Sequence, residues 1–81
     1  MELTKGQQDL LIKHTSEARK ALYDAQTKVS DLMYALLENG MESSDLEIKV
    51  LEGIIGNLFS EVTANDNVYK SLVKRGIIKL Y

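Results

Sequence analysis

Apolar residues recur through the first half of the chain at alternating spacings of four and three residues. This spacing is typical of a helix that packs along one seam, as in a coiled coil. The seam positions are Leu11, Thr15, Ala18, Leu22, Ala25, Val29, Leu32 and Leu36. Thr4 and Gln7 have the spacing of a capping box, and Gly40 suits the left-handed residue that ends a helix. The pattern therefore predicts a helix from about residue 5 to about residue 39.

A second, thinner apolar stripe lies beside this seam. Ile12, Tyr23 and Tyr34 are eleven residues apart, which is close to three helical turns, and Leu37 lies next to them. Tyrosine combines an apolar ring with a polar hydroxyl, so such a stripe is typical of the edge of a core. The alternative interpretation is a face that binds a second copy of the chain or another protein. These four residues are the candidate interface on the first helix.

A second helix is expected from about residue 45 to about residue 62, because Ser44 and Glu47 form another capping-box pattern. Its apolar positions cover about 220° of the helical wheel, which is more than one partner helix buries. They are Leu46, Ile48, Val50, Leu51, Ile54, Ile55, Leu58, Phe59 and Val62. Part of this apolar surface must therefore be covered by a further element or a partner, or remain exposed to solvent.

Gly53, Gly56 and Ser60 lie on the opposite side of the second helix. Each glycine inside a helix costs about 0.8–1.0 kcal/mol relative to alanine, so two of them need an explanation. The favoured interpretation is a tolerant surface or a closely packed neighbouring helix. The alternative is that another backbone or a ligand approaches this face closely, and the three residues are therefore a candidate interface.

The stretch TANDN, residues 63–67, is compatible with two different structures. Thr, Asn and Asp are weak helix formers and good caps, so a third helix could begin at Asn65 and cover residues 66–75. The spacing of the second helix nevertheless continues through Asn65 to Tyr69 and Leu72, as it would in one long helix. The apolar tail, residues 76–81, is expected to dock on a core or on a partner.

The lengths of these elements predict an elongated molecule. A helix of about 35 residues is roughly 50 Å long, whereas a compact globule of this size is about 30 Å across. The short connection at residues 40–44 makes the two helices antiparallel neighbours. The expected fold is therefore all-α: one domain, residues 1–81, that forms a long helical hairpin with a C-terminal helix or helix extension. Two such hairpins would bury the wide apolar arc in a four-helix bundle.

Composition and charge narrow the function classes. The chain has 81 residues, no cysteine and one histidine, which excludes a disulfide and leaves no ligand set for a zinc site. His14 is interpreted as a packing or surface residue, and no nucleophile or phosphate-loop motif is present. Residues 1–37 balance five acids with five bases, residues 38–66 carry seven acids and only Lys49, and residues 67–81 carry four bases and no acid. No catalytic residue, metal or cofactor is expected.

The leading hypothesis is a non-enzymatic helical interaction protein that self-associates as a dimer or tetramer and binds an unidentified protein partner as an inhibitor or regulator. One alternative is a helix-turn-helix-like DNA-binding regulator, whose phosphate contacts would be Lys70, Lys74, Arg75 and Lys79. Another is a binder of a phosphate-bearing small molecule between two hairpins. No signal peptide or membrane span is apparent, so a cytoplasmic location is expected.

Overall fold

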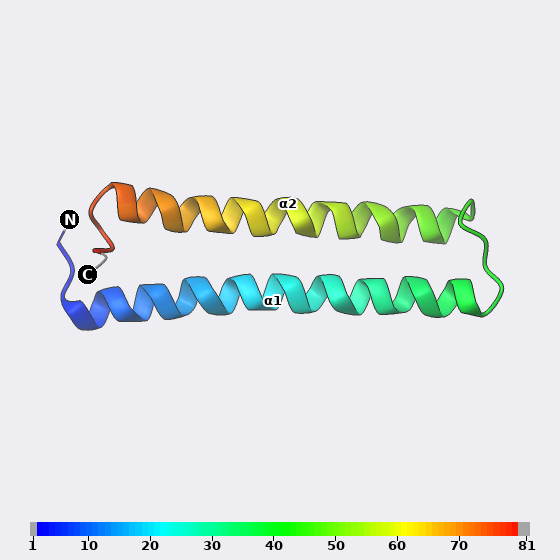
Figure 1. Cartoon of the computed structure of the whole chain (residues 1–81), viewed down its shortest axis with the longest axis horizontal. Coiled ribbons are helices and arrows are strands. Elements are labelled where there is room, and N and C mark those ends of the chain that lie inside the picture. Colours follow the sequence, from blue (N-terminus) through cyan, green and yellow to red (C-terminus); the bar gives the residue numbers. More distant parts are fainter. Residues whose placement is uncertain (1, 80–81) are drawn as a thin grey trace.

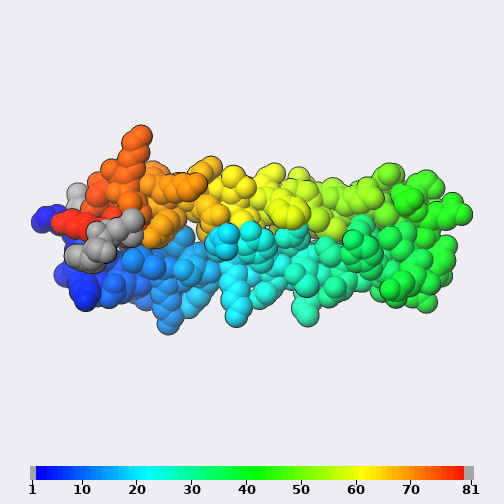
Figure 2. All heavy atoms as spheres, in the orientation of Figure 1, coloured from blue at the N-terminus to red at the C-terminus, as the bar shows by residue number. Residues whose placement is uncertain are grey.

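The computed structural model describes residues 2–79 as two long antiparallel helices, α1 (Lys5–Glu38) and α2 (Leu46–Lys74) (Figure 1). The molecule measures 55 × 17 × 16 Å. The two helices lie against each other along their whole length, without a globular end (Figure 2). The predicted all-α antiparallel hairpin and its elongated shape are thus confirmed.

The predicted ends of α1 are also confirmed. The Gln7 amide donates to Thr4 Oγ1 at 3.1 Å, and the Thr4 amide donates back to Gln7 Oε1 at 2.9 Å. This reciprocal pair is a capping box, which satisfies two amides that the first turn would leave unpaired. At the other end Gly40 has φ +102°, and the Met41 amide donates to the carbonyl of Leu36 at 3.0 Å. A positive φ is the reason that glycine ends this helix.

The predicted capping box at the start of α2 is wrong. Asp45 is the N-cap, and the helix begins at Leu46, so Glu47 occupies the second position of the helix. The Asp45 carboxylate accepts a hydrogen bond from the amide of Glu42 at 2.9 Å and forms no side-chain cap on α2. The connection is therefore organised around Asp45, one residue later than the pattern Ser44–Glu47 requires.

Residues 63–67 are helical, and the described part of the chain contains no separate third helix. The polar residues that resemble a cap are held by α1 instead. Asn65 Nδ2 donates to the carbonyl of Thr15 at 3.3 Å, and Asp66 pairs with Arg19 at 3.0 Å. Because these side chains bond across the hairpin, they do not compete for the backbone of α2. Of the two structures compatible with TANDN, the continuous helix is the one observed.

The seam of α2 faces α1 over the whole length of the hairpin. Its positions are all buried or half-buried: Ile48, Leu51, Ile55, Leu58, Val62, Asn65, Tyr69 and Leu72. On α1 the face that packs against α2 is rotated about the helix axis relative to the predicted seam. Its positions are Gln8, Ile12, Thr15, Leu22, Gln26, Val29, Met33 and Leu36, whereas Ala18, Ala25 and Leu32 of the predicted seam are exposed. One partner helix therefore covers only part of the apolar surface of α1.

The C-terminal tail docks on the start of α1, as far as residue 79. Gly76 has φ +73° and turns the chain back, and the amides of Ile77 and Ile78 donate to the carbonyl of Leu72. Both isoleucines are at most 5% exposed. Figure 1 shows the two termini at the same end of the hairpin. The predicted docking is confirmed for this part of the tail, while Leu80 and Tyr81 lie outside the described residues.

Candidate interaction surfaces

The hydrophobic core of the hairpin is small, so much apolar surface remains outside it. Within residues 2–79 the fully buried hydrophobic residues are Ile48, Leu51, Val62, Ile77 and Ile78. The large hydrophobic residues that remain exposed are Leu10, Tyr23, Leu32, Tyr34, Leu46, Val50, Ile54, Phe59 and Val68. An exposed set larger than the buried one is typical of a chain that packs against something else.

An apolar hollow lies between the helices near the loop. Leu32 and Leu36 of α1 and Leu46, Val50 and Leu51 of α2 line it, together with the edge residue Glu47, and its volume is about 360 Å³. Leu32 and Val50 are each more than half exposed, at 52% and 53%. These side chains have the size and spacing of core residues, yet the single hairpin leaves them in water.

The hollow belongs to a longer stripe that we name the apolar flank. On α1 its members follow one another every seven residues, a spacing that keeps them beside the seam that faces α2. On α2, Ile54 lies one helical turn after Val50 and shares its face. The flank consists of Leu11, Ala18, Ala25 and Leu32 of α1 and Val50, Ile54 and Val68 of α2. Near the termini a second hollow adjoins the flank and is lined by Leu3, Gln7, Leu10, Leu11 and His14.

The predicted stripe on α1 is distributed over different environments. Ile12 and Leu37 are half-buried, and Ile12 lines a notch between the two helices. Tyr34 points into solvent and is 60% exposed. Tyr23 stacks against Arg19, whose guanidinium carbon lies 4.8 Å from the ring centroid. The four residues therefore do not form one continuous surface in the hairpin, and their role as an interface stays a prediction.

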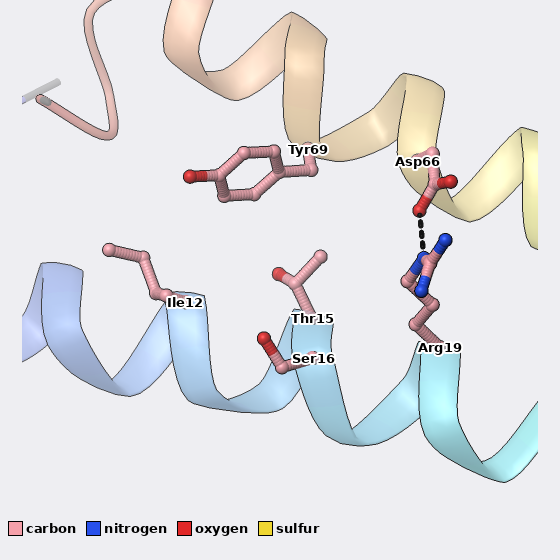
Figure 3. A pocket seen from close by; sticks show the side chains of 6 residues that line it. All are labelled: Ile12, Thr15, Ser16, Arg19, Asp66 and Tyr69. Atoms are coloured by element: carbon pink, nitrogen blue, oxygen red, sulfur yellow. Dashed lines mark hydrogen bonds and ion pairs between the residues drawn. The ribbon is translucent and has the colours of Figure 1, made fainter.

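The notch contains an ion pair that sequence reasoning missed. Arg19 Nε donates to Asp66 Oδ1 at 3.0 Å, while Tyr69 and Thr15 approach each other from the two helices (Figure 3). Arg19 Nη2 also lies 3.4 Å from the Tyr23 hydroxyl. Both partners of the ion pair are more than a third exposed, so its contribution to stability is small. Only the register between the helices could have revealed this pair.

The small-residue face of α2 is open in the single hairpin. Gly53, Gly56 and Ser60 are exposed, and a Cβ added to either glycine would meet no described atom within 4 Å outside its own helix. The Ser60 hydroxyl lies 3.4 Å from the carbonyl of Gly56 and bonds within the helix. The sequence correctly places these residues away from α1. A partner on this face stays a prediction.

The basic residues at the C-terminal end lie on the surface. Lys70, Lys74, Arg75 and Lys79 are exposed and belong to the end of the hairpin that holds both termini. The separate third helix on which the helix-turn-helix alternative depends is not seen in the described residues. A phosphate contact would therefore have to come from the end of a continuous helix and its tail, without a recognition helix set at an angle.

The remaining chemistry of the described residues is sparse. His14 is exposed, with Nδ1 3.7 Å from a carboxylate oxygen of Glu17. Among residues 2–79 no group of three or more His, Cys, Asp or Glu side chains is arranged to hold a metal ion. Neither described helix combines the length and apolarity that a membrane crossing requires. Comparison of the chain with protein-family models, curated proteins and solved structures returns no match.

Proposed function

We propose that this chain is a non-enzymatic interaction protein that self-associates through the apolar flank and binds a macromolecular partner, which it inhibits or regulates. The observation that carries the proposal is the flank itself. Its leucine, valine and isoleucine side chains run along one side of the hairpin, where the packing of α1 against α2 leaves them wholly or partly exposed. Covering them with a second apolar surface would provide the burial that the small core lacks.

The total exposed area supports self-association. The chain exposes 5967 Å², whereas a folded monomer of 9.1 kDa exposes roughly 4,900 Å². The excess of roughly 1,100 Å² exceeds the area of about 800 Å² that each partner contributes to a standard interface. One interface of ordinary size would thus remove most of the excess exposed area of each chain.

Binding of a different macromolecule would use faces outside the flank. Tyr34 on α1 and the Gly53, Gly56 and Ser60 face on α2 are exposed and remain free when the flank is covered. An exposed tyrosine supplies apolar area with a hydroxyl, which is a frequent combination in protein interfaces. These residues are the proposed contacts for the partner.

Light scattering coupled to size exclusion tests self-association, and two matched variants locate it. Leu32→Glu places a charge in the flank, and Tyr34→Glu places the same charge two residues away on another face of α1. Both side chains are more than half exposed, so both variants should keep the helical circular dichroism of the wild type. We expect an oligomeric wild type, a monomeric Leu32→Glu and an oligomeric Tyr34→Glu.

A monomeric wild type would overturn the self-association. If Tyr34→Glu is monomeric and Leu32→Glu is not, the interface is the face of α1 that contains Tyr34, and not the flank. Absorbance recorded at two wavelengths in the same run reports nucleic acid that purifies with the protein, because the chain contains no tryptophan. Co-purifying nucleic acid would favour the DNA-binding alternative.

A further inference from the structure

We infer that the surface covering the apolar flank is a second copy of this chain in antiparallel orientation, with the loop of each hairpin beside the termini of the other. The inference rests on the self-association proposed above and adds its geometry. The product is a four-helix bundle whose two loops lie at opposite ends. A two-fold axis crosses the middle of the hairpins, so that each copy offers the same surface to the other.

Charge is distributed unevenly between the two halves of the hairpin. The contact between Arg19 and Asp66 fixes which residues lie opposite each other, and residues 22–60 accordingly form the half that contains the loop. This half carries seven acidic and two basic side chains, a formal charge of −5. The half that contains the termini carries five acidic and eight basic side chains, a formal charge of +3. The hairpin is therefore negative at one end and positive at the other.

This asymmetry selects the orientation of the second copy. A parallel pair would place two negative loop halves together and two positive terminal halves together, which is unfavourable at both ends. An antiparallel pair places each negative half beside a positive one. The preference holds at physiological salt for charges near the interface, because screening acts over about 8 Å and side-by-side hairpins bring their side chains within that distance.

The shape of the flank is compatible with this arrangement. The large side chains lie toward its ends, at the hollow that contains Leu32 and at the hollow that contains Leu11. Between them the α1 positions of the flank are Ala18 and Ala25, whose small side chains let two helices approach closely where they cross the axis. In the antiparallel pair, the loop hollow of each copy faces the terminal hollow of the other.

Distances between spin labels test the orientation. Because the chain has no cysteine, a single introduced thiol carries a single label. Ser43→Cys labels the loop, and Ala21→Cys labels the middle of α1; both residues are exposed. For the antiparallel pair we expect an intermolecular distance comparable with the 55 Å length of the molecule for Ser43→Cys. We expect a much shorter distance for Ala21→Cys, because its two labels lie on either side of the axis.

The possible outcomes separate the orientation from the self-association. A short distance for Ser43→Cys would show a parallel pair and overturn the inference, while self-association would stand. Long distances at both positions would show copies that overlap only at their ends, which also overturns it. A wild-type mass of one chain, with no intermolecular signal from either label, would overturn the proposed self-association as well.

Discussion

The backbone amide of Lys79 donates a hydrogen bond to Gln8 Oε1 at 2.9 Å, and this bond joins residues 71 positions apart in the chain. Gln8 Nε2 in turn donates to the carbonyl of Leu3 at 3.1 Å. Both polar atoms of the Gln8 side chain, Oε1 and Nε2, are thus hydrogen-bonded, and the residue is only 5% exposed. A buried amide that satisfies two backbone groups ties the N-terminal segment, the first turns of α1 and the C-terminal tail into one unit.

Replacement of Gln8 by alanine should therefore destabilise the hairpin. It leaves the Lys79 amide and the Leu3 carbonyl without their partner, which costs about 1–3 kcal/mol of the free energy of unfolding. Urea denaturation at one fixed protein concentration measures the loss, because the stability of a self-associating chain depends on concentration. Asn67→Ala, at an exposed amide side chain on another face of α2, is the control and should not lower stability, because alanine is the better helix former. Equal midpoints for Gln8→Ala and wild type would contradict the structural role of Gln8.

The continuity of α2 through residues 63–67 can be tested with proline. Asn67 is exposed and lies inside the helix, so Asn67→Pro removes a helical hydrogen bond and should lower stability by about 3 kcal/mol or more. In a separate third helix that began at Asn65, the same proline would fall in the first turn and would be tolerated. Lys5→Pro, at the first position of α1, is the matched control and should be close to neutral. An Asn67→Pro variant as stable as Lys5→Pro would bring back the third helix.

The small-residue face predicts a gain in stability. Gly53→Ala combined with Gly56→Ala meets open space in the hairpin and should raise the free energy of unfolding by about 2 kcal/mol through helix propensity. Gly40→Ala is the contrasting variant, because its φ of +102° should make alanine destabilising by about 1 kcal/mol or more. Thermal unfolding measures both changes. A double variant that is more stable but no longer assembles or binds its partner would place a close contact on this face.

The basic end distinguishes self-association from DNA binding. Neutralising Lys70, Lys74 and Arg75 with glutamine should weaken the antiparallel pair, because the loss of these three of eight positive charges reduces the formal charge of the terminal half from +3 to 0. We expect a larger fraction of monomer by light scattering, and no retention of duplex DNA by either the wild type or the variant at physiological salt. Salt-dependent DNA binding by the wild type that the variant loses would instead support the DNA-binding alternative.

The features that the sequence predicts well are those set by local chemistry. Thr4 with Gln7, and the glycine at position 40, mark the ends of α1 because capping depends on neighbours within one helical turn. The alternation along α2 from Ile48 to Leu72 correctly identifies the residues that face α1, including the polar Asn65. In α2 the side chains at the three- and four-residue spacing of the sequence are also the ones that pack against α1.

The errors arise where the choice depends on the partner helix. On α1 the predicted seam and the stripe beside it are together wider than one neighbouring helix covers, and the packing places Gln26 inside and Ala25 outside. The cap-like character of Asn65 and Asp66 did not reveal that Thr15 and Arg19 would bind them from α1. The face of α1 that packs against α2 is rotated about the helix axis relative to the predicted seam. For the candidate surfaces, this difference places Ile12 at the interface between the helices and leaves Leu32 exposed.

The bond between Gln8 and Lys79 and the buried Ile77 and Ile78 close the end of the hairpin that has no loop. Two helices joined by a single loop ordinarily fray from their free ends, where neither chain is held. In this molecule, separation of the helices from this end must first expose two buried isoleucines and break the hydrogen bond between the Lys79 amide and Gln8. Fraying from the ends is therefore suppressed. We expect the backbone amides of both helices to exchange hydrogen together, through one cooperative unfolding of the hairpin.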